Sequence, residues 1–422
     1  MSGKAAVIRG LPELIETLRA VDSFQEIVAA MQRGNSGTID GAWGSSCALA
    51  AAAISQECSG PLLIVLPRIS EIEDYAVDLA SLVEEPPVVF PAWEALPKEH
   101  SVSDAIFGAR LRVLQQLESD SPPKIIVSAL PALLQPVPSQ EERLAGTKTL
   151  KVGDILDSDE LLRWLVDRGF ERVPAIEMPG EFSVHGGIID IFSPEAVDPL
   201  RMELFGDEVD SLRWFDVETQ RKVEDAKEIQ LVAVAPTDET ATNSLGNASF
   251  LDSLPEKSWI VLSELSDLVD EGKKYLQRLE NPRGLFSVDA TLAKCTQKPT
   301  VSISALAEAS FETTCHLQVE SIERFTGPKN EVIQELGTIV GQEEQVLLAC
   351  HNQGERERLT DLITEEDPEL AKRITLCLGA VTHGYRLVQS NIVVLSDNEM
   401  FSRVHVRNVK KSKSKRLQSR AI

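Results

Sequence analysis

The sequence predicts a multidomain α/β protein in which a small α+β module is inserted into the chain. Three observations indicate this fold. A glycine turn opens an alanine-rich helix that leads to an apolar strand at residues 61–66, the layout of an α/β nucleotide-binding fold. Residues 177–215 form the densest run of β-branched and aromatic residues. From residue 325 onward, helical and apolar strand patterns alternate again, which predicts a second, compact α/β domain with a parallel sheet.

The charge balance indicates an acidic surface. The 422 residues include 66 Asp and Glu against 42 Lys and Arg, a formal net charge of −24. Such a surface repels a phosphate backbone, so a protein partner with basic patches is favoured over free duplex DNA. The length allows roughly two to four domains, each able to bury a core.

The cysteines and the apolar runs argue against metal-binding and membrane classes. The six cysteines show no C-x-x-C spacing, so we expect reduced thiols and no metal site. The longest apolar run, residues 47–54, is too short to span a bilayer, and we find no signal peptide. The sequence therefore predicts a cytoplasmic protein with no membrane partner.

The N-terminal α/β segment carries the frame of a phosphate-binding P-loop without its chemistry. A P-loop, G-x-x-x-x-G-K-[ST], needs glycines around the phosphates, a lysine on the β and γ phosphates and a hydroxyl on magnesium. Here Gly41 and Gly44 lie in the frame, but Ser46 replaces the last glycine, Cys47 the lysine and Ala48 the hydroxyl. We expect a degenerate loop, with no cofactor and no catalytic residue in this chain.

The other elements of this segment are predicted from hydrophobic periodicity and from the proline and glycine residues that end helices and strands. Helical patterns precede the loop, and the proline-spaced tract 131–138 indicates a domain boundary. Further elements are expected as helices at 11–19, 24–33 and 72–83 and strands at 88–90 and 124–129.

The middle module is predicted to pack strands on one helix. A D-x-x-E capping signal and an apolar stripe predict a helix at 157–169. The run 182–192 is interrupted by Gly186-Gly187, which we interpret as a bulge or bend. Two further strands, 200–205 and 208–215, flank the tight-turn signal Gly206-Asp207.

Alternation within residues 200–205 separates a core face from a second face. Leu200, Met202 and Leu204 share the core face, and the other face carries Arg201, Glu203 and Phe205. An aromatic residue beside an arginine is the composition of a protein-interface hot spot. The alternative is that Phe205 tucks under a turn and Arg201 pairs with Glu203 or another acid.

This stretch closely resembles a known family. The run GEFSVHGGIIDIF at 180–192, followed by RMELFGDEVDSLRWFDVETQR at 201–221, resembles the UvrB-homology module of bacterial transcription-repair coupling factors and of UvrB. The W-E-x-L-P turn at 93–97 and the run GAVTHGYRL at 379–387 also resemble coupling factors. The resemblance implies a docking surface for UvrA in transcription-coupled nucleotide excision repair.

The resemblance also implies which residues contact UvrA. Arg201 and Phe205 match two positions of the family's UvrA-facing surface, and Glu203 lies between them. The third position is usually arginine but is His185 here. Histidine is mostly neutral at pH 7 and makes at most two hydrogen bonds, whereas arginine offers a charged fork of donors.

The resemblance, together with the proline, glycine and charge-rich boundaries in the sequence, predicts five segments. They are a degenerate P-loop-like α/β domain at 1–146, the UvrA-binding α+β module at 147–232, the remainder of the UvrB-like region at 233–325, a compact α/β domain at 326–405, and a basic tail at 406–422. The tail is a candidate nucleic-acid contact through Lys410, Lys411, Lys413, Lys415 and Arg416.

The resulting functional hypothesis is a module that recruits UvrA to a stalled RNA polymerase without ATPase activity of its own. By resemblance, RNA polymerase and DNA would be reached only through C-terminal domains that this chain lacks, so it is a truncated or a naturally short product. One alternative is a fragment of an ATP-dependent DNA translocase whose motor lies beyond Ile422. Another, a standalone nucleotide-binding metabolic enzyme, has no nucleophile–base or metal constellation to support it.

Overall fold

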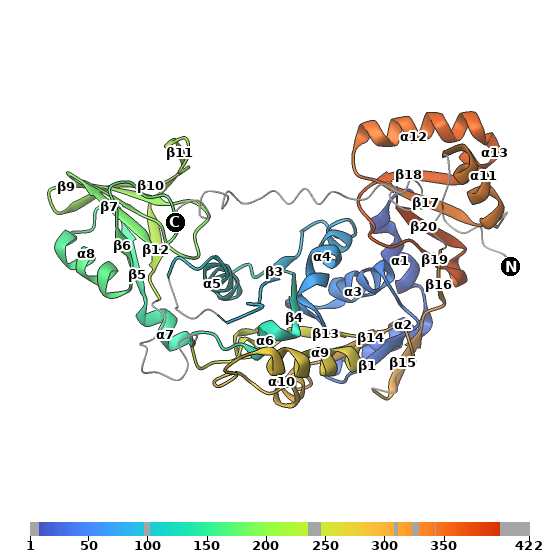
Figure 1. Cartoon of the computed structure of the whole chain (residues 1–422), viewed down its shortest axis with the longest axis horizontal. Coiled ribbons are helices and arrows are strands. Elements are labelled where there is room, and N and C mark those ends of the chain that lie inside the picture. Colours follow the sequence, from blue (N-terminus) through green and yellow to red (C-terminus); the bar gives the residue numbers. More distant parts are fainter. Residues whose placement is uncertain are drawn as a thin grey trace.

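The computed structural model describes residues 8–96, 102–234, 246–307, 311–322, 329–341 and 343–396. Three sheet-bearing parts lie in a row, with a seven-stranded sheet between a six-stranded sheet and a five-stranded sheet (Figure 1). The multidomain α/β class predicted from the sequence is therefore confirmed. The basic tail, including Lys410, Lys411, Lys413, Lys415 and Arg416, lies outside the described residues.

The seven-stranded sheet is parallel throughout, as expected for strands that are apolar on both faces. Its last strands in sequence return to the sheet after the six-stranded module, so part of the predicted segment 233–325 completes the first sheet. In spatial order the strands are β15 (Thr313–His316), β1 (Gly37–Asp40), β14 (Thr300–Ser304), β13 (Trp259–Ser263), β2 (Leu62–Leu66), β4 (Ile125–Ala129) and β3 (Val88–Phe90).

Helices bury both faces of this sheet in two separate cores. One core takes residues from α1 (Leu14–Arg19), α2 (Asp22–Gln32), α3 (Ser45–Glu57) and α4 (Ile72–Ala80). The other takes residues from α5 (Ala105–Leu117), α6 (Leu130–Leu134), α9 (Leu265–Arg278) and α10 (Val288–Cys295). The alanine-rich α3 is buried along nearly its whole length because the C-terminal part packs into the same core.

The six-stranded sheet forms the middle module, and α8 (Ser158–Asp167) contributes to its core. The run 182–192 is two strands and not one interrupted strand, because Gly186-Gly187 is a two-residue hairpin turn. The tight turn predicted at Gly206-Asp207 is confirmed. The spatial order is β11 (Lys222–Ala226), β10 (Glu208–Phe215), β9 (Leu200–Phe205), β8 (Ile188–Ile191), β7 (Glu181–His185) and β6 (Glu171–Arg172).

Two connections join the module to the seven-stranded part. After α7 (Gln140–Ala145), the chain enters through β5 (Thr147–Lys151) and leaves through β12 (Glu228–Val232), which pair with each other. Helix α5 also contacts the module, since Arg112 donates from Nε to the Glu195 carbonyl oxygen at 2.5 Å and from Nη2 to that of Ala196 at 3.1 Å.

The C-terminal part has a mixed sheet, not the wholly parallel sheet that the strand pattern predicts. β17 (Gln345–Cys350) pairs in parallel with β18 (Ile374–Leu378) and β20 (Ile392–Ser396), but β19 (Tyr385–Leu387) and β16 (Val319–Ser321) add antiparallel pairs. β16 precedes the predicted bound at residue 326, because three residues of extended chain carry too weak a pattern to recognise. The helices of this part are α11 (Lys329–Ile339), α12 (Gln353–Glu366) and α13 (Pro368–Ala371).

Within the described ranges, no helix is both long enough and apolar enough to cross a membrane.

Candidate functional site

The open face of the six-stranded sheet brings together the four residues that the sequence singles out. On β9, Leu200 and Met202 are buried in the module's core, whereas Arg201, Glu203 and Phe205 alternate with them on the other face. The register pairs Glu203 with Ile188 and Ile188 with His185, and residues directly opposite share a face. His185 therefore lies on the same face as the β9 residues.

Phe205 is the exposed residue of this set. It is the last residue of β9, immediately before Gly206, whose φ of 66° permits the tight turn. Its side chain is 82% exposed, so it does not tuck under the turn. An aromatic side chain that is exposed to solvent at the end of a strand is available to fill a pocket of a partner protein, as hot-spot residues do.

Arg201 is held within the sheet by an acid on the neighbouring strand. Its Nε and Nη2 donate to the two carboxylate oxygens of Asp190, each at 2.7 Å, and the guanidinium stacks on the Phe215 ring at 4.2 Å. The Asp190 carboxylate raises the pKa of Arg201. The expected alternative of an ion pair is thus observed with Asp190 and not with Glu203.

Arg201 is only 20% exposed, since Nη2 also donates to Gln220 at 3.0 Å. Its Nη1 group makes no hydrogen bond to the described part of the chain. The guanidinium can therefore still offer one edge to a partner while its other edge neutralises Asp190.

Glu203 and His185 are engaged by their own neighbours. One Glu203 oxygen accepts from Arg213 and the other accepts from the Ser211 hydroxyl at 3.1 Å. His185 Nε2 lies 2.6 Å from the Pro174 carbonyl oxygen, and because a carbonyl only accepts, Nε2 carries the proton. These two residues order the face around Phe205 and Arg201.

Asp190 is the residue of this face that the sequence analysis missed. It is buried, yet it stands in an apolar strand, IIDIF, where an acid needs a cationic partner. That signal was available in the sequence, but strand register was needed to name Arg201 as the partner.

The second candidate region is the loop between β1 and α3. The structure confirms that a glycine turn, with Gly41 and Gly44 at positive φ, opens α3 and that α3 leads to β2. Strand β1 before the turn is an element that the sequence pattern does not predict. Four amides of the loop and the first turn of α3 are already bonded: Ala42 donates to the Ser304 carbonyl, Trp43 to Ser46 Oγ, Ser46 to the Trp43 carbonyl and Cys47 to the Gly44 carbonyl. Cys47 and Ala48 are buried in the core, and burial raises the pKa of the Cys47 thiol.

A loop from the C-terminal part, residues 379–384, covers the N-terminus of α3. The His383 amide donates to Ser45 Oγ at 2.9 Å, and the His383 Cβ lies close enough to Gly44 that a side chain there would press on it. Asp78 of α4 accepts from the Thr382 amide at 2.7 Å and from its hydroxyl at 2.8 Å. Burial raises the pKa of Asp78 to about 6.

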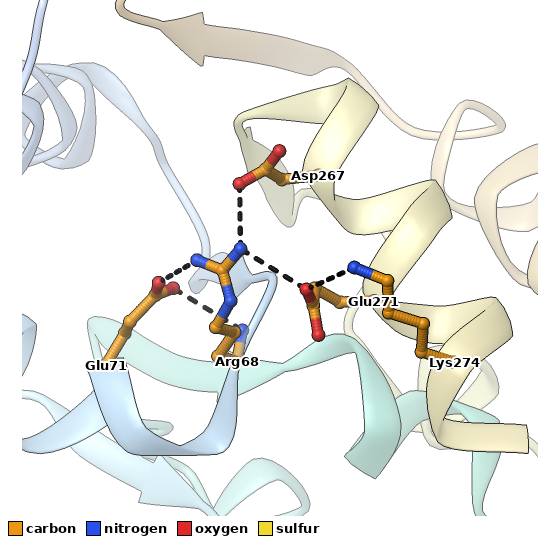
Figure 2. Close-up of polar contacts among 5 residues, drawn as sticks. All are labelled: Arg68, Glu71, Asp267, Glu271 and Lys274. Atoms are coloured by element: carbon orange, nitrogen blue, oxygen red, sulfur yellow. Dashed lines mark hydrogen bonds and ion pairs between the residues drawn. The ribbon is translucent and has the colours of Figure 1, made fainter. Parts of the chain in front are cut away.

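Arg68, which lies just beyond the carboxyl end of β2, is already paired with acidic side chains. Figure 2 shows Arg68, which follows β2, between Glu71 and the α9 acids Asp267 and Glu271. Its Nη2 lies 3.1 Å from Asp267 and 3.3 Å from Glu271, which Lys274 also contacts. Ligands of α/β sheets bind at this edge, so a phosphate would have to compete with three carboxylates for Arg68. In the described part of the chain, no group of three His, Cys, Asp or Glu could hold a metal ion.

Sequence comparison identifies the module. Residues 149–236 match the family model described as "UvrB interaction domain". The chain is therefore a multidomain α/β protein with a module that is similar to the UvrB interaction domain.

About half of the chain is related to transcription-repair-coupling factors. It is 30% identical over 217 residues to the factor of Bacillus subtilis (strain 168), which covers 51% of this chain and 18% of the relative. It is 34% identical over 233 residues to that of Mycobacterium bovis, covering 53% and 18%. The chain thus matches less than a fifth of the length of these relatives.

One similar solved structure is a DEAD box protein from the hyperthermophile Methanococcus jannaschii. The match covers 84% of this chain and 73% of that chain, with 9% identity and a TM-score of 0.30. A likeness at that score carries no argument about fold or function.

Proposed function

We propose that the six-stranded module docks UvrA through its open face, with Phe205 and Arg201 as the main contacts. The observation that carries the proposal is the match of residues 149–236 to the UvrB interaction domain over a face whose aromatic residue is 82% exposed. Phe205 supplies apolar area for a pocket of the partner, and the open edge of Arg201 donates to an acceptor beside that pocket.

The wider proposal is a role in transcription-coupled nucleotide excision repair, linking a stalled RNA polymerase to the excision machinery. It is supported by relatives named transcription-repair-coupling factor that are 30% and 34% identical over about half of this chain. Contacts to RNA polymerase and DNA would then belong to other regions of a longer protein, as would any translocase activity.

Titration of purified UvrA against the whole chain tests the docking surface. Phe205→Ala should weaken binding by about 2 kcal/mol, roughly thirtyfold, because the anchor is lost while the exposed position leaves the fold unchanged. His185→Ala should have a smaller effect, since His185 bonds mainly to the Pro174 carbonyl. His185→Arg should be neutral or tighten binding.

The matched control is Val166→Ala. Val166 is also exposed, at 56%, but it lies on α8. A folded Phe205→Ala chain that binds UvrA like the parent would contradict the proposed surface.

We further propose that this chain neither binds nor hydrolyses ATP. Cys47 and Ala48 replace the phosphate-binding lysine and the magnesium-binding hydroxyl. The bonded amides of Ala42, Trp43, Ser46 and Cys47 support the same conclusion, because a P-loop presents its amides to phosphates. DNA-stimulated ATP turnover by the purified chain at about 1 s⁻¹ or faster would be incompatible with it.

A further inference from the structure

A second exposed apolar side chain stands in line with Phe205. The segment before α8 runs beside the β9–β10 hairpin, where the Leu156 amide donates to the Asp207 carbonyl at 2.7 Å and the Val209 amide to the Asp154 carbonyl at 2.9 Å. These bonds flank the bridge between Ile155 and Glu208. Ile155 and Glu208 are therefore a non-hydrogen-bonded antiparallel pair, the kind in which side chains approach most closely.

The register places three side chains in one row. Glu208 is opposite Phe205 on β9 and opposite Ile155 on the other side, and directly opposed residues point to the same face. Since neighbouring strands lie about 5 Å apart, Ile155 and Phe205 are separated by roughly 10 Å with Glu208 between them.

Ile155 is exposed without a packing role. It is 77% exposed, similar to Phe205 at 82%, whereas Val209 beside Glu208 is completely buried. The hairpin thus buries Val209 and presents Phe205 to solvent, and the segment paired with it presents Ile155 on the same face. Two exposed apolar side chains held in one row by strand pairing can enter a partner's cleft together, as paired hot-spot side chains do.

The charged side chains within the two segments that carry this row have one sign. The ionisable residues of segments 153–156 and 205–210 are all acids, and all four are exposed: Asp154, Asp207, Glu208 and Asp210. The complementary surface is therefore an apolar cleft edged by basic side chains, which a protein partner offers and a nucleic acid does not.

We propose that Ile155 is a second apolar anchor of the UvrA-docking surface and that Glu208, between the two anchors, meets a basic side chain of UvrA. The inference rests on the proposed function. It is supported by the position of both segments within residues 149–236, the part that matches the UvrB interaction domain.

The test is a titration of purified UvrA against the whole chain and four variants, with thermal unfolding of each variant as the check on folding. Ile155→Ala should weaken binding about tenfold, because its truncation removes most of a buried aliphatic contact. Glu208→Gln should weaken binding about threefold, and Glu208→Lys about thirtyfold with a slower association rate, because the attraction becomes repulsion. Val166→Ala on α8 is the control and should bind like the parent.

The salt dependence of binding separates the electrostatic contribution of Glu208 from its steric contribution. Raising NaCl from about 50 to about 300 mM should weaken the parent's binding more than that of Glu208→Gln, because one screened attraction is missing in the variant. Equal salt dependence of the two would overturn the proposed role of Glu208.

The outcomes distinguish this inference from the proposed function. If the parent binds UvrA and Phe205→Ala weakens it while folded Ile155→Ala binds like the parent, the second anchor is overturned and the docking function stands. If the parent does not bind UvrA, the proposed function fails and the inference fails with it.

Discussion

Asp190 lies buried beneath the open face of the six-stranded sheet and depends on Arg201 for its countercharge. Both of its oxygens are bonded by the guanidinium, which also stacks on Phe215. Arg201 neutralises this buried acid, and in the proposed docking surface it would also present its Nη1 edge to the partner, so one substitution removes both.

Arg201→Ala should lower the free energy of opening of the module by about 3 kcal/mol, because it leaves the Asp190 charge buried without a partner. Hydrogen exchange of the β8 and β9 amides measures this opening locally. The double variant Arg201→Ala/Asp190→Ala should recover part of the loss, since the unpaired charge is then absent. If the β8 and β9 amides exchange at the same rates in Arg201→Ala as in the parent, the ion pair does not contribute to the stability of the module.

The same pair shows how far the sequence defines the candidate site. Alternation along β9 is sufficient to place Arg201, Glu203 and Phe205 on one face, because side chains in a strand alternate with a period of two. It cannot identify Asp190 or Ile155 as neighbours, because these depend on which strands pair and in what register. That register is fixed by packing across the whole module.

At the scale of elements, helix α5 approaches the module so closely that one position must be glycine. A Cβ at Gly108 would overlap the backbone carbonyl group of Pro194, which, unlike a side chain, cannot change rotamer to make room. The Arg112 bonds to the Glu195 and Ala196 carbonyls follow one turn later along the same helix. Together these contacts fix the segment after β8 against the seven-stranded part.

Gly108→Ala should therefore destabilise the junction by about 2 kcal/mol, although alanine favours helix formation over glycine by about 1 kcal/mol. The control is Gly354→Ala in α12, where the added Cβ would meet only ordinary contacts and stability should be equal or higher. Thermal unfolding of the two variants provides the comparison. A Gly108→Ala chain at least as stable as Gly354→Ala would show that α5 and the Pro194 backbone can move apart without loss of stability.

Elements with strong local signals were predictable, and those made by pairing were not. Strands β9 and β10 match the predicted 200–205 and 208–215, because alternation and the Gly206-Asp207 turn both lie within a few residues. The Gly186-Gly187 hairpin was interpreted as a bulge or bend, because the flanking residues give the same apolar pattern whether the strand bends or reverses. The antiparallel strands β16 and β19 have only three residues each, too few for a periodic signal.

At the scale of the whole molecule, the first and last sheets share a core and a polar junction. Asp78 lies at this junction, where it accepts from Ser45 and from both donors of Thr382. Asp78 and Thr382 are 304 positions apart, so no local pattern in the sequence predicts their contact.

Stability should depend on pH through Asp78. Burial raises its pKa from 3.8 to about 6, so the folded state favours the protonated carboxyl more than the unfolded state does. The resulting stability is fully present below pH 3.8 and is lost as the pH rises to about 6 and above. Over that range, the parent should lose about 3 kcal/mol relative to Asp78→Asn, which does not titrate.

Thermal unfolding of the parent and of Asp78→Asn at a series of pH values between these limits measures the difference, and the other carboxyls cancel because both chains contain them. A constant difference between the two chains across this range would contradict the raised pKa.

The loop that places His383 over Ser45 would make a phosphate site difficult to build at the β1–α3 loop. Changing Cys47 to lysine and Ala48 to threonine would recreate the missing side chains, yet the amides of Trp43 and Ser46 would remain bonded within the loop. His383, 338 positions away along the chain from Ser45, would still cover the N-terminus of the helix. A nucleotide site at this position would therefore require coordinated changes in two segments that lie far apart in the sequence, and one of them also joins the first and last sheets.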